Sequence, residues 1–152
     1  QLQMQVCLKD DKKEGELLCW HKNGQLRRQM YFKDDKLEGE ETVWHKNGKI
    51  ESVIYYKDGL KEGEAKGWHE GGQLKTLVSF KDDKVEGEYK EWYKSGQLHV
   101  QCYFSSDKKE GEHKEWYESG KIELISYYKD NKREGEVKEW YENGQLSRHS
   151  NY

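Results

Sequence analysis

Residues 14–26 read Glu-Gly-Glu-Leu-Leu-Cys-Trp-His-Lys-Asn-Gly-Gln-Leu, and this stretch contains the signals that decide the fold. The run before Asn23-Gly24 is rich in apolar and aromatic residues, which favour extended structure. Asn-Gly is a strong hairpin signal, because both residues accept the positive φ angles of tight hairpin turns. Leu26 opens a second extended run that ends at Phe32. The stretch therefore predicts one β-hairpin.

The same pattern recurs every 24 residues through the whole chain, and a fixed period is typical of repeat proteins. The tryptophans are Trp20, Trp44, Trp68, Trp92, Trp116 and Trp140, and the Glu-Gly-Glu glycines are Gly15, Gly39, Gly63, Gly87, Gly111 and Gly135. A Leu or Ile follows six residues after each tryptophan, and a Phe or Tyr closes each unit. We interpret residues 1–152 as one array of six 24-residue units with one leading half-unit. Repeat arrays need atypical terminal units, and none is evident here, so we expect a fragment of a longer protein.

Composition sets the kind of core that this array can form. Of the 152 residues, 32% are hydrophobic and 38% are charged, a balance close to that of disordered chains. Six Trp, eleven Tyr and three Phe favour folding, because large rings each bury about 150–250 Å². We predict an all-β fold organised around a thin aromatic seam. It should be an elongated, single-layer antiparallel β-meander of about thirteen strands, twisted into a curled ribbon.

Two registers are compatible with the hairpin. A two-residue loop pairs Trp20 with Arg27, whereas a three-residue loop pairs Trp20 with Leu26 and Gly15 with Tyr31. A slip of one residue turns every side chain to the other face of the sheet. We prefer the three-residue loop, because it places the tryptophan, leucine and closing aromatic columns on one face. It also lays a tyrosine ring over a bare glycine.

The opposite face of the predicted sheet carries two columns of rings. One column contains His21, His45, His69, Tyr93, Tyr117 and Tyr141, and the other contains Tyr31, Tyr55, Tyr103 and Tyr127. A contiguous exposed aromatic surface is typical of a contact surface. We take these ten residues as the candidate interaction face. The six tryptophans and the six Glu-Gly-Glu glycines are taken as structural.

No residue pattern in the chain predicts catalysis, a cofactor or a metal. The Glu-Gly-Glu carboxylates recur in every unit, which indicates a structural role in cross-strand ion pairs with lysines. Equivalent histidines lie two strands apart, about 10 Å, whereas zinc ligands lie about 2 Å from the metal. The aspartate turns Asp10-Asp11, Asp34-Asp35 and Asp82-Asp83 lack the ligand spacing of a calcium loop. We therefore expect that the protein is not an enzyme.

Charge and cysteine content limit the classes of partner and the cellular compartment that we expect. The net charge is −3 with both signs interleaved, so we expect no nucleic-acid partner. No apolar run reaches membrane-spanning length and no signal-peptide pattern opens the chain. Cys7, Cys19 and Cys102 sit at unrelated positions of the repeat, which argues against a disulfide framework. These features predict a reducing, cytoplasmic location.

The pattern Glu-Gly-Glu-x-x-x-Trp-[His/Tyr]-x-[Asn/Ser]-Gly-[Gln/Lys]-[Leu/Ile] resembles the variant class of MORN repeats over the whole chain. Bacterial antitoxin-like proteins and proteins of large DNA viruses carry similar arrays. The resemblance implies an elongated β-sheet used for protein–protein contact. Lipid binding is proposed for the wider family, but the tryptophan after Glu-Gly-Glu and the net negative charge argue against it here.

We therefore expect a non-catalytic scaffold that binds a protein partner, with an antitoxin-like role as one form. The alternative is a carbohydrate-binding, cell-wall module whose aromatic ladders stack on sugars. An open meander also leaves two edge strands, residues 1–8 and 145–152, with unpaired backbone groups. These edges predict edge-to-edge self-association.

Overall fold

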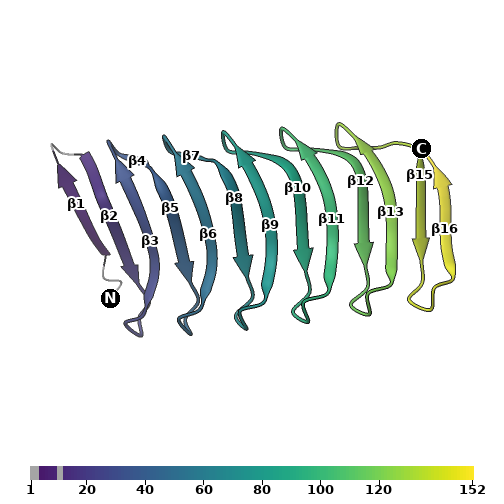
Figure 1. Ribbon diagram of the computed structural model, residues 1–152, viewed down its shortest axis with the longest axis horizontal. Coiled ribbons are helices and arrows are strands. Elements are labelled where there is room, and N and C mark those ends of the chain that lie inside the picture. Colours follow the sequence, from purple (N-terminus) through teal and green to yellow (C-terminus); the bar gives the residue numbers. More distant parts are fainter. Residues whose placement is uncertain (1–3, 10–11) are drawn as a thin grey trace.

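The structure is a computed structural model that describes residues 4–9 and 12–152. Thirteen strands follow one another in chain order across one open antiparallel sheet, and the two termini lie at opposite ends of the ribbon (Figure 1). The all-β meander is confirmed. Residues 1–3 of the predicted first edge strand, and the predicted Asp10-Asp11 turn, lie outside the described residues.

The strands of this path are β1 (Met4–Lys9), β2 (Lys12–Trp20), β3 (Leu26–Lys33), β5 (Gly39–Trp44), β6 (Ile50–Lys57), β8 (Gly63–Trp68), β9 (Leu74–Lys81), β10 (Lys84–Trp92), β11 (Leu98–Ser105), β12 (Lys108–Trp116), β13 (Ile122–Lys129), β15 (Glu136–Trp140) and β16 (Leu146–Asn151). Three short strands, β4 (Lys36–Leu37), β7 (Leu60–Lys61) and β14 (Lys132–Arg133), pair with the end of the strand before them.

Two rows of turns form the long rims of the ribbon. The tryptophan rim consists of the turns that follow each tryptophan: 21–25, 45–49, 69–73, 93–97, 117–121 and 141–145. In the first, the Gly24 amide donates to the His21 carbonyl at 2.9 Å, and the His21 amide donates to the Gln25 carbonyl at 2.8 Å. Gly24 has φ +85°, so the predicted three-residue loop with a left-handed glycine is confirmed.

The opposite row, the aspartate rim, consists of two-residue turns at 34–35, 58–59, 82–83, 106–107 and 130–131. Asp34 and Asp35 have φ angles of 48° and 66°. Both central residues of such a primed turn need positive φ, which Asp and Asn tolerate better than other side chains. The Asp-rich composition of this rim therefore follows from its backbone geometry.

The register beyond the tryptophan turn differs from the prediction. Trp20 pairs with Leu26 as expected, but a β-bulge then shifts the register, and Gly15 pairs with Phe32. The predicted pairing of Gly15 with Tyr31 is wrong. The physical reason is the extra residue Arg27, which leaves two residues of β3 opposite one of β2. Each hairpin in which both strands are described has the same shift beside its tryptophan.

This shift decides which columns share a face, because side chains alternate along a strand. Tyr31 pairs with Glu16, four residues before Trp20, so the Tyr31 column lies on the same face as the tryptophans. We call this the tryptophan face. Phe32 and its equivalents lie on the other side, the core face, together with Leu17 and Met30. The prediction that tryptophans and closing aromatics share one face is therefore wrong.

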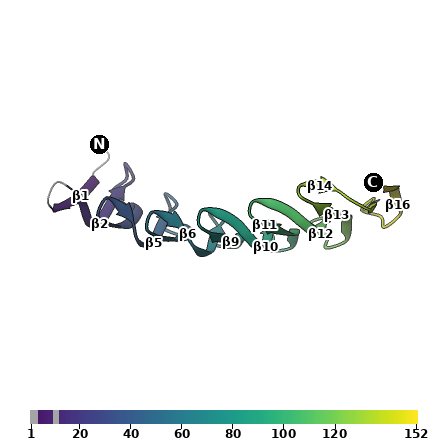
Figure 2. The same ribbon diagram turned by 90° about the horizontal axis from the view of Figure 1, so that it is seen from above.

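The buried side chains gather on the core face. They are Leu17, Met30, Glu41, Tyr56, Ala65, Cys102, His113, Leu124, Ser126 and Val137, with Thr42 on the other side. The strands bend at Glu-Gly-Glu, where Glu86-Gly87-Glu88 face the single residue Ser79 of the preceding strand. Figure 2 shows this curvature along the ribbon. Since burial is concentrated on one side, the core face is the inner side of the bend, and the tryptophans are only half-buried.

The closing aromatic column is packed within this bend. The Tyr89 and Phe104 rings meet edge to face with centroids 6.1 Å apart. The Lys61 ammonium lies 5.0 Å from the centre of the Phe80 ring, a cation–π contact. Burial and the neighbouring Glu41 carboxylate raise the pKa of Tyr56 to about 12. The aromatic seam thus exists, but the closing Phe/Tyr column forms it.

Candidate functional site

The two predicted ring columns lie at different places on the sheet. Tyr31 and its equivalents project from the tryptophan face, whereas the His/Tyr column follows the tryptophans along the rim. Tyr117 lines a hollow at this rim together with Leu124 of the core face and Trp140 of the tryptophan face. The structure therefore does not unite the ten predicted residues into one surface.

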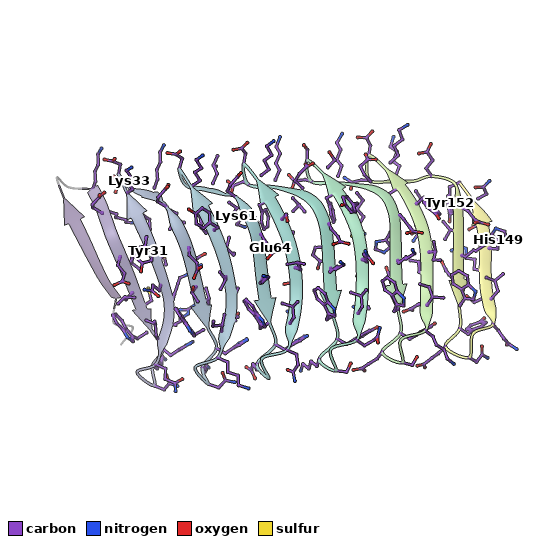
Figure 3. The ribbon with its side chains drawn as sticks, viewed as in Figure 1. Tyr31, Lys33, Lys61, Glu64, His149 and Tyr152 are labelled. Carbon is purple, nitrogen blue, oxygen red and sulfur yellow. The ribbon has the colours of Figure 1, made fainter. Side chains whose placement is uncertain are left out.

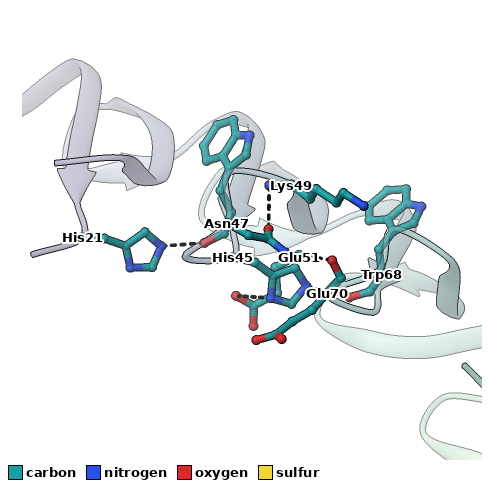
Figure 4. A network of polar contacts seen from close by, with 8 residues as sticks. His21, His45, Asn47, Lys49, Glu51, Trp68 and Glu70 are labelled. Carbon is teal, nitrogen blue, oxygen red and sulfur yellow. Dashed lines mark hydrogen bonds and ion pairs between the residues drawn. The ribbon is translucent and has the colours of Figure 1, made fainter. Parts of the chain in front are cut away.

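The His/Tyr column joins neighbouring units. The ring nitrogen Nε2 of His21 lies 2.8 Å from the Trp44 carbonyl oxygen, and Nε2 of His45 lies 2.9 Å from the Trp68 carbonyl oxygen (Figure 4). The hydroxyls of Tyr93 and Tyr117 donate to the tryptophan carbonyls of the following units, at 3.0 and 2.7 Å. His69 makes the same contact with Trp92 at 3.0 Å. These five rings are half-buried, and Tyr141 is 58% exposed.

The turn asparagines add a second row of contacts between units. The Asn23 side-chain amide donates to the Lys46 carbonyl at 3.0 Å. The Asn47 side-chain amide donates to the Glu70 carbonyl at 2.9 Å (Figure 4). The same side chains accept from the backbone two residues ahead. Asparagine therefore shapes its own turn and ties that turn to the next unit.

The Tyr31 column is the most exposed aromatic group on either face. Tyr31, Tyr55, Tyr103 and Tyr127 are 41%, 48%, 54% and 39% exposed. Figure 3 shows Tyr31 on the broad surface of the sheet. Ile50 and Leu146, from the Leu/Ile column of this face, are 40% and 51% exposed. Ser79 interrupts the column, so the tyrosines form two pairs from adjacent units.

Polar side chains surround these tyrosines. The Tyr31 hydroxyl donates to Glu16 at 3.1 Å, and the Tyr127 hydroxyl donates to Glu112 at 3.3 Å. The hydrogen bond to Glu16 raises the pKa of Tyr31. The phenols of Tyr31 and Tyr127 are thus held by carboxylates and remain accessible to solvent. The surface can therefore offer an aromatic ring, an acceptor and a donor at one place.

The two glutamates of each Glu-Gly-Glu motif have different roles. The first accepts a hydrogen bond from the backbone amide of the next aspartate-rim turn, as Glu14 does from Asp34 at 3.0 Å and Glu86 from Ser106 at 2.8 Å. In the four motifs with a lysine two residues later on the same strand, the second glutamate forms an ion pair with that lysine. These pairs are Glu64–Lys66, Glu88–Lys90, Glu112–Lys114 and Glu136–Lys138, at 2.6–2.8 Å.

The structural role predicted for these glutamates is thus supported, but the cross-strand lysine partners are wrong. Residues two apart on a strand share a face, so the nearest lysine lies along the strand. The hydrogen bond with Lys90 holds the pKa of Glu88 below its usual range. The result is a row of paired charges that separates the exposed tyrosines from the tryptophans.

The aspartate turns also connect units. The Asp35 carboxylate accepts from the Lys13 amide at 2.7 Å, and the Asp35 amide donates to the Lys13 carbonyl at 3.1 Å. Asp83 makes the equivalent pair of bonds with Lys61. Because one carboxylate oxygen already binds a backbone amide, these turns are structural.

The chemistry available to the described residues is limited. Within residues 4–9 and 12–152, no group of three or more His, Cys, Asp or Glu side chains could hold a metal ion. Cys19 and Cys102 are unpaired. The buried His113 lies 2.7 Å from Glu115 through Nε2, and this contact lowers the pKa of Glu115. Sequence reasoning missed this pair, because it depends on the burial of residue 113.

Comparison with known families is consistent with this architecture. Residues 13–34, 37–58, 61–82, 85–105, 109–130 and 133–152 each match the MORN repeat variant family, so the chain belongs to that family. MORN repeats are generally associated with scaffolds that bind proteins or membranes. No curated protein matches the chain. In the described part of the chain, no helix combines the length and apolar character needed to cross a bilayer.

Proposed function

We propose that this chain is a non-catalytic scaffold that binds a protein partner through its tryptophan face. The observation that carries the proposal is the exposure of Tyr31, Tyr55, Tyr103 and Tyr127 on one face, at 39–54%. Tyrosine is enriched at protein interfaces, where it supplies a large contact area and a polar end. The His/Tyr column is less suited to this role, since its ring atoms are occupied between units.

The arrangement of the tyrosines suggests how a partner would sit. Tyr31 and Tyr55 belong to adjacent units and so lie about 10 Å apart, two strand spacings. Tyr103 and Tyr127 repeat this arrangement three units further along. The rows of Glu–Lys pairs between the rings favour a partner with polar groups of both signs. An antitoxin-like role is one specific form of this proposal. We also propose a cytoplasmic location for the scaffold.

A carbohydrate-binding module is the second candidate. Evenly spaced exposed rings can stack on sugars, and the carboxylate beside each ring could accept from sugar hydroxyls. A glycan array and a pull-down distinguish the two functions. A carbohydrate-binding module should bind specifically on the glycan array, whereas a protein-binding scaffold should capture a partner in the pull-down. Edge-to-edge pairing through β1 or β16, which end the sheet, remains a separate prediction.

The test is a triple substitution, Tyr55→Ser, Tyr103→Ser and Tyr127→Ser, in a pull-down followed by mass spectrometry. We expect the partner captured by the wild-type chain to be lost, with the thermal unfolding midpoint little changed because the rings are exposed. Tyr141→Ser is the control, since Tyr141 is more exposed than any of the three, at 58%, but lies in the other column. Equal capture by the triple variant would remove the tryptophan face as the binding surface.

A further inference from the structure

The tryptophan rim carries a charge gradient along the ribbon. The equivalent segments 19–27, 43–51, 67–75, 91–99, 115–123 and 139–147 contain each rim turn with its flanking residues. The first has two basic residues and no acidic one, and the second has two basic and one acidic. The third and fourth have one of each sign, the fifth has one basic and three acidic, and the sixth has two acidic. With histidine neutral, the net charges are +2, +1, 0, 0, −2 and −2.

A hollow beside the rim lies at each end of this gradient. At the basic end, Lys22, Arg27 and Lys46 line the hollow, together with Glu51 and Glu70. His21 and His45 form part of its wall. The basic residues outnumber the acidic ones here, and residues of three successive units line the hollow.

The hollow at the other end has the opposite charge. Glu115, Glu123 and Glu139 line it beside Tyr117 and Tyr141. Glu139 lies 3.6 Å from Arg148, and Glu115 is bonded to His113. After burial, the carboxylates of Glu123 and Glu142 are the main cause of the raised pKa of Tyr117. The rim segments at this end therefore carry an excess of acidic residues.

Several charged side chains of the rim are available to a partner, and four of them lie toward the two ends of the gradient. Lys22, Arg27, Glu118 and Glu142 are exposed, and none forms a side-chain hydrogen bond or ion pair within the described part of the chain. Lys22, Glu118 and Glu142 lie in turns of the tryptophan rim, and Arg27 is the second residue of β3, directly after its turn. Figure 1 shows these turns in one row along one edge of the ribbon. Their charges are therefore not compensated within the molecule.

We propose that the tryptophan rim is an interface between two antiparallel copies of this chain. The gradient is self-complementary about its neutral centre: an antiparallel copy places the first unit against the sixth and the second against the fifth. A two-fold axis forms each of these contacts twice. A parallel copy would place like charges together, which costs free energy. Exposed ion pairs are individually weak, so the pairing depends on salt and is of modest affinity.

Sedimentation velocity on the intact chain tests the association. At low salt we expect a monomer–dimer equilibrium whose dissociation constant rises at least tenfold at a salt concentration several times higher. The double variant Lys22→Glu/Arg27→Glu should weaken the dimer at least tenfold, because it places −2 opposite −2 in the contact of the first with the sixth segment. Glu139→Lys/Glu142→Lys places +2 opposite +2 in the same contact and should weaken the dimer equally. The combination of all four places −2 opposite +2, so it restores complementarity and should restore the dimer. Lys33→Glu/Lys57→Glu makes the same charge change on the aspartate rim and should leave dimerisation unchanged.

The orientation is tested by a zero-length carbodiimide cross-link between Lys46 and Glu118. These residues lie three units apart in one ribbon, about 29 Å, so a cross-link between them must join two copies. Circular dichroism melts establish that each variant is folded. A chain that is monomeric at every salt concentration overturns the proposal, as does a fourfold variant no tighter than either double variant. Assemblies that grow beyond a dimer would indicate end-to-end association instead.

Discussion

The Nε2 nitrogen of His21 lies 2.8 Å from the carbonyl oxygen of Trp44, the equivalent tryptophan of the next unit. In later units the Tyr93 and Tyr117 hydroxyls occupy the same place. A carbonyl oxygen only accepts hydrogen bonds, so the position requires a ring with a donor at its end. Both His and Tyr satisfy that requirement. The need for a donor at this position thus explains why both His and Tyr occur in the column.

Removal of one such donor should lower stability. Tyr117→Phe leaves the Trp140 carbonyl without its 2.7 Å donor, and we expect a loss of about 1 kcal/mol in the free energy of unfolding. Tyr141→Phe is the control, because its hydroxyl forms no hydrogen bond with any residue that the structure describes, and it should be neutral. Urea denaturation measures both. Equal effects of the two variants would show that the hydroxyl bond is not responsible.

The cost of losing a tryptophan should depend on its place in the array. Trp92→Ala removes a half-buried ring with a neighbouring unit on each side. We expect about half of the roughly 3–5 kcal/mol typical of fully buried aromatic truncations. Trp140→Ala should cost less, since its unit contacts one other unit. Matched denaturation curves with identical losses would contradict nearest-neighbour coupling between units.

A glycine of the bend provides a test of backbone strain. Gly87 has φ +86°, and a Cβ added there would meet no atom within 4 Å. Gly87→Ala should therefore destabilise the fold only through the left-handed conformation, by about 1–2 kcal/mol. Gly87→Asn should cost less, because asparagine tolerates this conformation better. If asparagine proves worse than alanine in thermal melts, the bend depends on side-chain volume instead.

The His113–Glu115 contact predicts a specific pH dependence. The contact lowers the pKa of Glu115 in the folded state relative to the unfolded chain. Its stabilisation is therefore complete above the ordinary glutamate pKa of about 4.3 and is lost as pH falls through the folded value. The difference in unfolding free energy between the wild type and Glu115→Gln should shrink from pH 6 to pH 3. A constant difference across this range would mean that the carboxylate charge contributes nothing.

The repeat, the meander and the three-residue turn could be predicted from the sequence, because each depends on local signals such as Asn23-Gly24. The β-bulge at Arg27 could not, since its equivalents include Glu51, His99 and Ser147 and share no chemical character. Another part of the sequence did contain a signal for the register. Leu17 and Met30 both belong to largely non-charged columns, and pairing them requires the observed register.

The candidate surface was only partly predictable for a related reason. The exposure of Tyr31 follows from its column once the register is known, but the contact of His21 with Trp44 spans two units. The stacking of one hairpin on the next sets that distance, and no residue within a single unit reports it. Repeat sequences define the unit more clearly than the contacts between units.

The path of the chain across the sheet has a mechanical consequence. Backbone hydrogen bonds between strands run along the length of the ribbon, and the two termini lie at its opposite ends (Figure 1). Tension applied between the ends therefore loads strand pairs one after another, as in opening a zipper, and does not shear them together. A unit spans about 10 Å when folded and about 80 Å when pulled straight. Under load the protein becomes an extensible tether that lengthens about eightfold, unit by unit, at low force.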